Sequence, residues 1–313
     1  MKHIFALILM ISMLLASCGS VSETPVSDNA VTFTDALDRT VTVENPRRVA
    51  ALLGSFADVW MLSGGTLCAA ADDAWEDFGL ESDSVVNIGG AHTPSLEMLL
   101  SADPDFVIAS SSTASNVEML ETLEAAGVTV AYFDVDNFSD YLQMLDICTD
   151  ITGRKDLYDQ NGLQLQTQIE EVKKLYTREN IPQEQKKVLL IRAAASVIKA
   201  KGSTGTILGE MLADMGCINI ADSELALLEN LSVEAVIQEQ PYHIFVVTMG
   251  SDTAGARAAL ENLFRENPAW NTLEAVEFGR MYFMDKKLFN LKPNELWAEA
   301  YRILYETLTK DEI

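Results

Sequence analysis

The sequence SLEMLL at residues 95–100 recurs in related form as SVEAVI at residues 232–237. A proline follows the glutamate of each copy by seven residues, Pro104 after Glu97 and Pro241 after Glu234, and an apolar run comes next in both. Each copy is typical of a short helix, a turn at the proline and a buried strand. The chain therefore contains a duplicated half of a strand–helix–strand unit.

The repeated pattern extends upstream of both copies. A basic pair precedes an apolar run in each, and a helix-like segment ending in glycine then follows, at 56–64 and at 204–216. Strands separated by helical segments indicate mostly parallel sheets covered on both faces. The expected strands are 49–53, 67–71, 106–109 and 128–133 in a first α/β lobe, and 188–191, 217–220, 244–248 and 281–284 in a second.

A long helix is predicted to join the two lobes. Residues 155–178 contain few helix breakers, and Gly162 is the weak point of the segment. We therefore expect a first lobe at 31–154, a connecting helix at 155–180 and a second lobe at 181–313.

The first residues are typical of an export signal. Lys2 and His3 precede an apolar run that is too short for a comfortable membrane span, and Leu15-Ala16-Ser17-Cys18 follows. Small residues before a cysteine predict a lipoprotein signal peptide at 1–17, with lipid attached to Cys18. The alternative is an ordinary signal with a chance cysteine. The polar segment that ends at residue 30 suits a flexible tether.

Composition excludes several functions. The chain has 22 basic and 47 acidic residues, and a net charge of −25 disfavours binding to nucleic acid. Cys68, Cys148 and Cys217 are widely spaced among apolar residues, so buried thiols are expected rather than a disulfide framework.

Motifs for catalysis are missing as well. There is no G-x-x-x-x-G-K-[ST] sequence, and neither Ser55 nor Ser203 has the paired glycines of a nucleophile elbow. Beyond the signal only His92 and His243 are present, one in each lobe, so we predict no transition-metal site. His243 enters a predicted core strand and is expected to be structural. No catalytic residue and no intrinsic cofactor are predicted.

Several segments resemble the substrate-binding proteins of ABC importers for iron siderophores and cobalamin. NIGGAHTPSLEMLLSADPDFVIA at 87–109 is similar to that family's glycine loop, glutamate-bearing helix and following strand, and 231–247 is similar to the second-lobe counterpart. Further matches are DRTV at 38–41 with PRRV at 46–49, and PAWN at 268–271. The resemblance covers about residues 31–309. It implies two Rossmann-like lobes joined by one rigid helix, a ligand between the lobes and little closure.

The resemblance also implies a role for two glutamates. Glu97 and Glu234 occupy the positions where this family meets arginines of the permease subunits. The simpler explanation is that a carboxylate in the first turn of a helix complements the helix dipole. Pro94 as the first helical residue would make Thr93 the cap and leave Glu97 outside a capping box.

Ligands of open α/β sheets lie beyond the carboxyl ends of the strands. The residues predicted there are Phe56, Trp75, His92, Ser111, Arg192, Lys199, Lys201, Met249 and Phe289. Arg192 follows an apolar strand, where an unpaired guanidinium is costly, so an anionic ligand or a structural ion pair is expected beside it. The three aromatic residues are as consistent with core packing as with ligand contact.

We therefore expect a lipid-anchored, extracytoplasmic binding protein that delivers a ferric siderophore-type chelate to its permease. Haem, cobalamin or an oxyanion is the alternative ligand. A bilobed extracytoplasmic enzyme is disfavoured by the missing motifs, and a sensor or adhesive lipoprotein by the paired glutamates.

Overall fold

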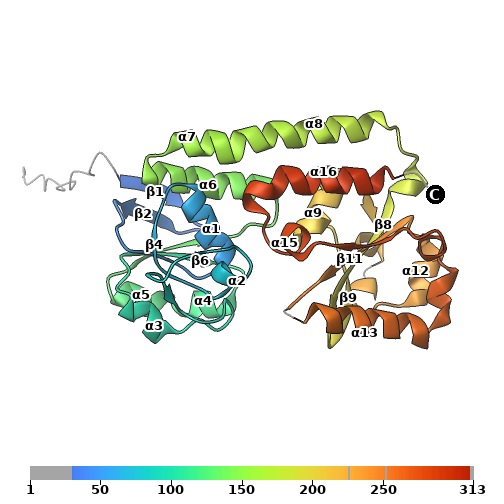
Figure 1. Cartoon of the computed structure of the whole chain (residues 1–313), viewed down its shortest axis with the longest axis horizontal. Coiled ribbons are helices and arrows are strands. Elements are labelled where there is room, and N and C mark those ends of the chain that lie inside the picture. The colour runs from blue at the N-terminus through green and yellow to red at the C-terminus, as the bar shows by residue number, and fades with distance from the viewer. Residues whose placement is uncertain (1–29, 225, 251, 311–313) are drawn as a thin grey trace, which may run out of the picture.

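The structure is a computed structural model that describes residues 30–224, 226–250 and 252–310. It forms two α/β lobes side by side, bridged by long helices along one edge (Figure 1). The predicted signal peptide and Cys18 lie outside the described residues. Among the residues described, no helix is long and apolar enough to cross a membrane.

The first lobe is built on a five-stranded parallel sheet in the order β5-β4-β3-β6-β7. The central strands are buried on both faces, as their continuous apolar runs predicted. The sheet strands are β3 Val49–Ala51, β4 Leu67–Ala70, β5 Val86–Asn87, β6 Phe106–Ser110 and β7 Thr129–Phe133. The helices are α1 Gly54–Leu62, α2 Asp73–Glu76, α3 Leu96–Ser101, α4 Ala114–Glu118, α5 Leu120–Ala125 and α6 Phe138–Thr152. A hairpin of β1 Ala30–Thr34 and β2 Thr40–Glu44 was not predicted.

The second lobe repeats this plan with one change. Its parallel strands run in the order β10-β8-β11-β12, and an added strand, β9, pairs antiparallel with β8. The strands are β8 Lys187–Ala194, β9 Val197–Lys201, β10 Ile218–Asn219, β11 His243–Thr248 and β12 Met281–Met284. The helices are α9 Ile207–Asp214, α10 Ile220–Ser223, α11 Ala226–Glu229, α12 Val233–Glu239, α13 Thr253–Glu266, α14 Glu274–Glu277 and α15 Lys286–Phe289. Lys199 and Lys201, expected in a loop, therefore lie in a strand, which sets the face of the sheet on which each lies.

The predicted connecting helix is present, with one irregular turn. It comprises α7 Lys155–Tyr158, a π-helical turn at Asp159–Leu163 and α8 Gln164–Arg178. Gly162 lies in that turn, and a Cβ atom there would be 3.0 Å from Leu142 Cδ2 of α6. The glycine thus permits a close approach of the connecting helix to the first lobe. The last helix, α16 Trp297–Leu308, follows the short η4 Asn294–Leu296 and runs beside α8 (Figure 1).

One apolar cluster passes through both lobes and the bridging helices. At the junction Trp297 packs on Phe138 and Tyr141 of the first lobe, with ring centroids 5.8 and 6.5 Å apart. A cross-lobe ion pair adds to this contact, because Lys286 Nζ lies 3.1 Å from Asp77 Oδ2. The lobes therefore meet through a packed junction.

The repeated helices α3 and α12 begin in the same way. Ser95 Oγ accepts a hydrogen bond from the Met98 backbone at 3.3 Å, and Ser232 Oγ accepts one from Ala235 at 3.4 Å. The expectation that Thr93 caps a helix starting at Pro94 was wrong. The serine side chain satisfies the free amide one turn later, so the helix begins after Ser95.

Candidate ligand-binding cleft

The second lobe presents a row of cations beside the gap between the lobes. Arg192 lies near the carboxyl end of β8, directly opposite Lys199 of β9, and Lys201 lies two residues further along. Side chains two residues apart on a strand project from the same face. Like charges placed opposite each other destabilise a strand pair, so this row is costly in the absence of an anion.

Within the described residues no carboxylate forms an ion pair with these three cations, although the charge of Asp136 acts on Arg192 from further away. Among the described residues, no salt bridge or side-chain hydrogen bond joins Arg192, Lys199 or Lys201 to a partner. The Arg192 Nε atom is buried without a hydrogen bond. Burial lowers the pKa of Arg192, and it lowers that of Lys201 together with the neighbouring charges of Arg192 and Lys199. The structural ion pair considered for Arg192 is therefore not formed within the described chain.

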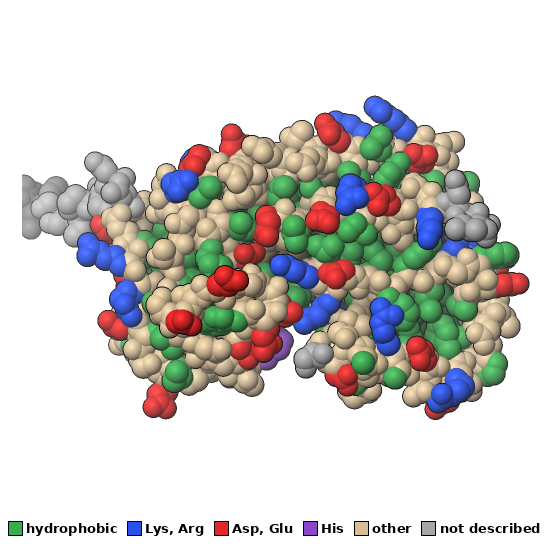
Figure 2. Space-filling view, viewed as in Figure 1, with side chains coloured by type: hydrophobic (Ala, Val, Ile, Leu, Met, Phe, Trp, Pro, Cys, Tyr) green, Lys and Arg blue, Asp and Glu red, His purple; other side chains and the backbone are tan. Residues whose placement is uncertain are grey.

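Lys292, between α15 and η4, extends the row toward the first lobe. Burial lowers the pKa of Lys292, and Asp136 and Asp134 of the loop after β7 oppose that effect. Acids of one lobe thus face bases of the other. Figure 2 shows acidic side chains on the first-lobe side of a notch between the lobes and basic side chains at its inner end. The sequence had indicated the segment from Phe289 to Lys292, and within it Lys292 is the residue on which the charges of those acids act.

Two of the predicted aromatic contacts are wrong. Phe56 and Phe289 are only 1% and 2% exposed and belong to the apolar core, where Phe56 packs edge-on against Phe133. Their side chains offer no surface to a ligand. Trp75 is half-buried, and its Nε1 donates to the Ser82 carbonyl at 3.4 Å.

The other candidates lie in loops after strands. Met249 follows β11 and is 42% exposed, and Ser111 follows β6 with its backbone N–H donating to the Phe133 carbonyl at 3.1 Å. His92 is exposed in the loop before α3. His243, expected to be structural, is buried in β11. Burial and the charge of Arg280 lower the pKa of His243 to about 4.

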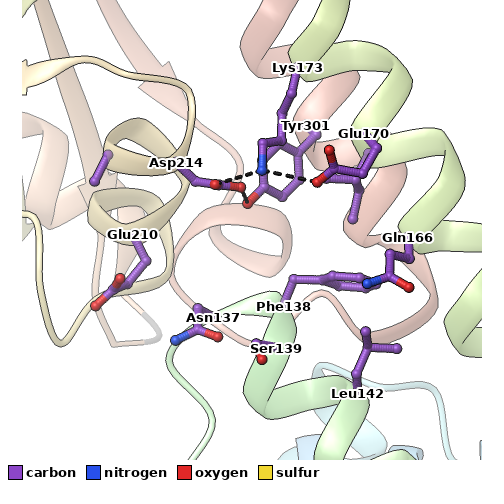
Figure 3. Close-up of a pocket in the computed structure, with 12 residues that line it drawn as sticks. Asn137, Phe138, Ser139, Leu142, Gln166, Glu170, Lys173, Glu210, Asp214 and Tyr301 are labelled. Atoms are coloured by element: carbon purple, nitrogen blue, oxygen red, sulfur yellow. Dashed lines mark hydrogen bonds and ion pairs between the residues drawn. The ribbon is translucent and has the colours of Figure 1, made fainter.

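A second hollow of about 400 Å³ lies under the connecting helix, between α6 and α9 (Figure 3). Its polar side is an ion-pair network, with Lys173 Nζ 2.8 Å from Asp214 Oδ1 and 3.1 Å from Glu170 Oε1. Tyr301 donates to Asp214 Oδ2 at 2.8 Å. The lining carries more acid than base, so an anionic ligand suits the basic notch and not this hollow.

The two repeated glutamates lie away from the notch. Glu97 and Glu234 are exposed at the second residue of α3 and of α12, and neither forms an ion pair within the described residues. Bonding to its own backbone amide and to Ser232 Oγ, which donates at 2.9 Å, lowers the pKa of Glu234. Both carboxylates are therefore available to a partner. No group of three or more His, Cys, Asp or Glu side chains in the described residues is arranged to hold a metal ion.

A family model described as periplasmic binding protein matches residues 49–288, which span both sheets. The chain belongs to this family. As a periplasmic binding protein it is the substrate-binding component of an ABC importer and not an enzyme, as the sequence resemblance implied.

Comparisons with individual proteins agree with this assignment. The putative ABC transporter substrate-binding lipoprotein YhfQ of Bacillus subtilis (strain 168) is 24% identical over 308 residues, covering 94% of this chain and 93% of YhfQ. The Fe(3+)-citrate-binding protein YfmC of the same organism is 23% identical, covering 90% of each chain. The apo periplasmic heme-binding protein RhuT from Roseiflexus sp. RS-1 is similar in structure, with a TM-score of 0.69 at 21% identity over 84% of this chain and 97% of RhuT. The two-lobed fold is thus that of these binding proteins.

Proposed function

We propose that this protein captures an anionic ferric complex of the siderophore type and delivers it to its ABC permease. The observation that carries the proposal is the row formed by Arg192, Lys199 and Lys201, which forms no ion pair within the described chain. The row gathers three cations in a protein whose net charge is −25. Such a concentration of cations suits a ligand with several carboxylate or catecholate oxygens.

The spacing of the cations favours an extended anion over a small oxyanion. Alternate residues on a strand lie about 6 to 7 Å apart, so Lys199 and Lys201 reach different groups of one ligand. The name of YfmC, a ferric citrate-binding protein, agrees with a polycarboxylate iron complex. Haem carries two carboxylates as well, and the heme-binding protein RhuT shares the fold. Haem is therefore the alternative ligand that the test must separate from a ferric complex.

The test is to titrate purified protein separately with ferric citrate, a ferric catecholate siderophore and haem. Binding is monitored by the change in tryptophan fluorescence. Arg192→Ala should weaken binding of an anionic ferric complex about tenfold or more, because a charge-assisted hydrogen bond contributes about 1.5 to 3 kcal/mol. Arg302→Ala on α16 removes the same charge away from the notch and should leave affinity unchanged.

Two results would contradict the assignment. If Arg192→Ala binds the ferric complex as tightly as the wild type while remaining folded, Arg192 is outside the site. If haem binds and neither ferric complex does, the ligand class is wrong.

The proposal includes a lipid anchor at Cys18, supported by the preceding Leu15-Ala16-Ser17 and by the relation to YhfQ, which is described as a lipoprotein. In its host, Cys18→Ser should move the protein from the membrane fraction to the soluble fraction, as seen by immunoblot. A Cys18→Ser variant that stays in the membrane fraction would exclude this anchor.

Permease docking through Glu97 and Glu234 is the remaining part of the proposal. Its support is that both carboxylates are exposed, have no ion pair within the described chain and occupy equivalent positions on the capped helices of the two lobes.

A further inference from the structure

A polar contact joins the two lobes between α2 and α15 (Figure 1). Lys286 Nζ lies 3.1 Å from each carboxylate oxygen of Asp77. Asp77 directly follows α2, which comes after β4 of the first sheet, and Lys286 begins α15, which comes after β12 of the second. Ligands of open α/β sheets lie beyond the carboxyl ends of the strands. The pair therefore joins the lobes on the side of both sheets where the ligand cleft is expected.

The next residue on each side adds a second contact. Lys287 Nζ lies 5.6 Å from the centroid of the Phe78 ring, a distance at which an ammonium group is attracted to an aromatic face. Phe78 is buried, so its ring has little freedom to move. Two consecutive residues of one lobe thus engage two consecutive residues of the other.

The stability of the two short helices does not explain these charges. Asp77 is the C-terminal cap of α2, and Lys286 is the first residue of α15. A carboxylate at the C-terminal end of a helix and an ammonium group at the N-terminal end both oppose the helix dipole. Each charge is therefore unfavourable within its own helix, and the attraction between the lobes offsets that cost.

The ion pair differs from the packed junction in its exposure. Trp297, at the junction, is 0% exposed, whereas the side chains of Asp77 and Lys286 are each 26% exposed. Ion pairs that keep contact with solvent contribute little to stability, so this pair can break while both lobes stay folded. The junction can therefore remain intact while the ion pair opens and closes.

We propose that Asp77 and Lys286 form a latch, which holds the lobes together beside the cleft and must break before the cleft can widen. The contact of Lys287 with Phe78 supports the same latch. A contact that exists in the closed arrangement and is absent from a wider one shifts the population toward the closed arrangement. Weakening the latch should therefore increase the population of the wider arrangement and speed the release of a bound ligand.

The test begins with Asp77→Asn and Lys286→Gln, which each remove one charge with little change in size. The double variant Asp77→Lys/Lys286→Asp reverses the pair. Lys187→Gln is the matched control, because Lys187 pairs with Glu239 inside the second lobe and the two side chains are 32% and 35% exposed. Hydrogen–deuterium exchange of the backbone amides in α2 and α15 is measured on ligand-free protein. Stopped-flow tryptophan fluorescence gives the dissociation rate of bound ferric citrate, and this second readout rests on the proposed function.

Both single variants should exchange the amides of α2 and α15 faster than the wild type does. Ferric citrate should dissociate from them about two- to fivefold faster, as expected for the loss of a partly exposed ion pair. The reversed pair should bring both rates back toward those of the wild type. Lys187→Gln should leave both rates unchanged.

Three results would overturn the latch. The first is that the single variants exchange these amides no faster than the wild type or Lys187→Gln. The second is that the reversed pair stays as fast as the single variants, because the two residues then do not act as a pair. The third is faster amide exchange with an unchanged rate of dissociation, because the contact then does not control the cleft. If ferric citrate does not bind the wild type, the proposed ligand is wrong, and amide exchange alone decides whether the latch exists.

Discussion

His243 is a titratable side chain that the fold keeps neutral. It lies in the middle of the second sheet, where Tyr242 and Phe245 pack against its ring. Burial is the main cause that lowers its pKa from 6.5 to about 4, and the nearby charge of Arg280 adds to it. In the unfolded chain the imidazole regains its ordinary pKa. The unfolded state therefore binds a proton that the folded state rejects between these two values.

Stability should consequently fall as the pH is lowered through this window. The contribution of His243 to the free energy of unfolding is fully present above about pH 6.5 and is lost by about pH 4. The shift in its pKa corresponds to a total loss of about 3 kcal/mol. Urea unfolding of the wild type and of His243→Gln at pH 7 and pH 4.5 isolates this effect, since the other groups titrate in both. If the two proteins lose the same free energy of unfolding, His243 is not responsible.

For single residues, the sequence predicted positions at the ends of strands but not the directions of the side chains. Arg192 was expected just after an apolar strand, and it lies near the carboxyl end of β8 with its Nε buried without a hydrogen bond. Phe289 is equally close to a strand end, yet its ring turns into the core while Lys292 approaches Asp134 and Asp136. The direction of a side chain in such a segment depends on what packs around it, and no local pattern encodes that.

Helices α3 and α12 show that the duplication preserves details of capping. Ser95 and Ser232 each satisfy a free amide of the first helical turn, and the glutamate two residues later remains exposed. Because each helix is short, its stability depends on this cap and on the apolar face beneath it. The cap therefore also fixes the start of the helix that presents Glu97 or Glu234 at the surface.

Ser95→Ala and Ser232→Ala should each reduce the free energy of unfolding by about 1 kcal/mol, since an N-cap hydrogen bond is lost. Ser101→Ala is the control on α3, because Ser101 is an exposed residue at the end of that helix, and it should change stability by less than about 0.5 kcal/mol. Urea unfolding measures all three. A loss for Ser101→Ala equal to that for Ser95→Ala would show that the cap is not the cause.

The elements best predicted were those with a strong apolar pattern. The connecting helix and the parallel strands other than the two-residue β5 were found, because buried runs and long helical segments leave clear signals. The strand β9 was missed, since Lys199 and Lys201 give it the polarity of a loop. If Lys199 and Lys201 bind the ligand as proposed, the residue pattern that serves the ligand conceals the strand that carries it.

The whole molecule combines a packed junction between the lobes with one exposed, capped glutamate helix on each lobe. One apolar cluster, the Lys286–Asp77 ion pair and the packing of Trp297 hold the lobes together. The small closure that the resemblance implies stays a prediction, and with it we expect the separation of Glu97 and Glu234 to change little when a ligand binds.

Docking and ligand binding should consequently respond to different substitutions. In vesicles containing the permease, Glu97→Ala and Glu234→Ala should each impair uptake while ligand titration stays near normal, because each removes a charge pair across an interface. The double variant should lose the most, with nearly additive free energies, since the two sites lie on different lobes. Glu121→Ala removes an exposed carboxylate from the first turn of α5 and controls for the helix dipole. Normal uptake in the double variant, with only a lowered melting temperature, would leave the two glutamates as helix-stabilising residues alone.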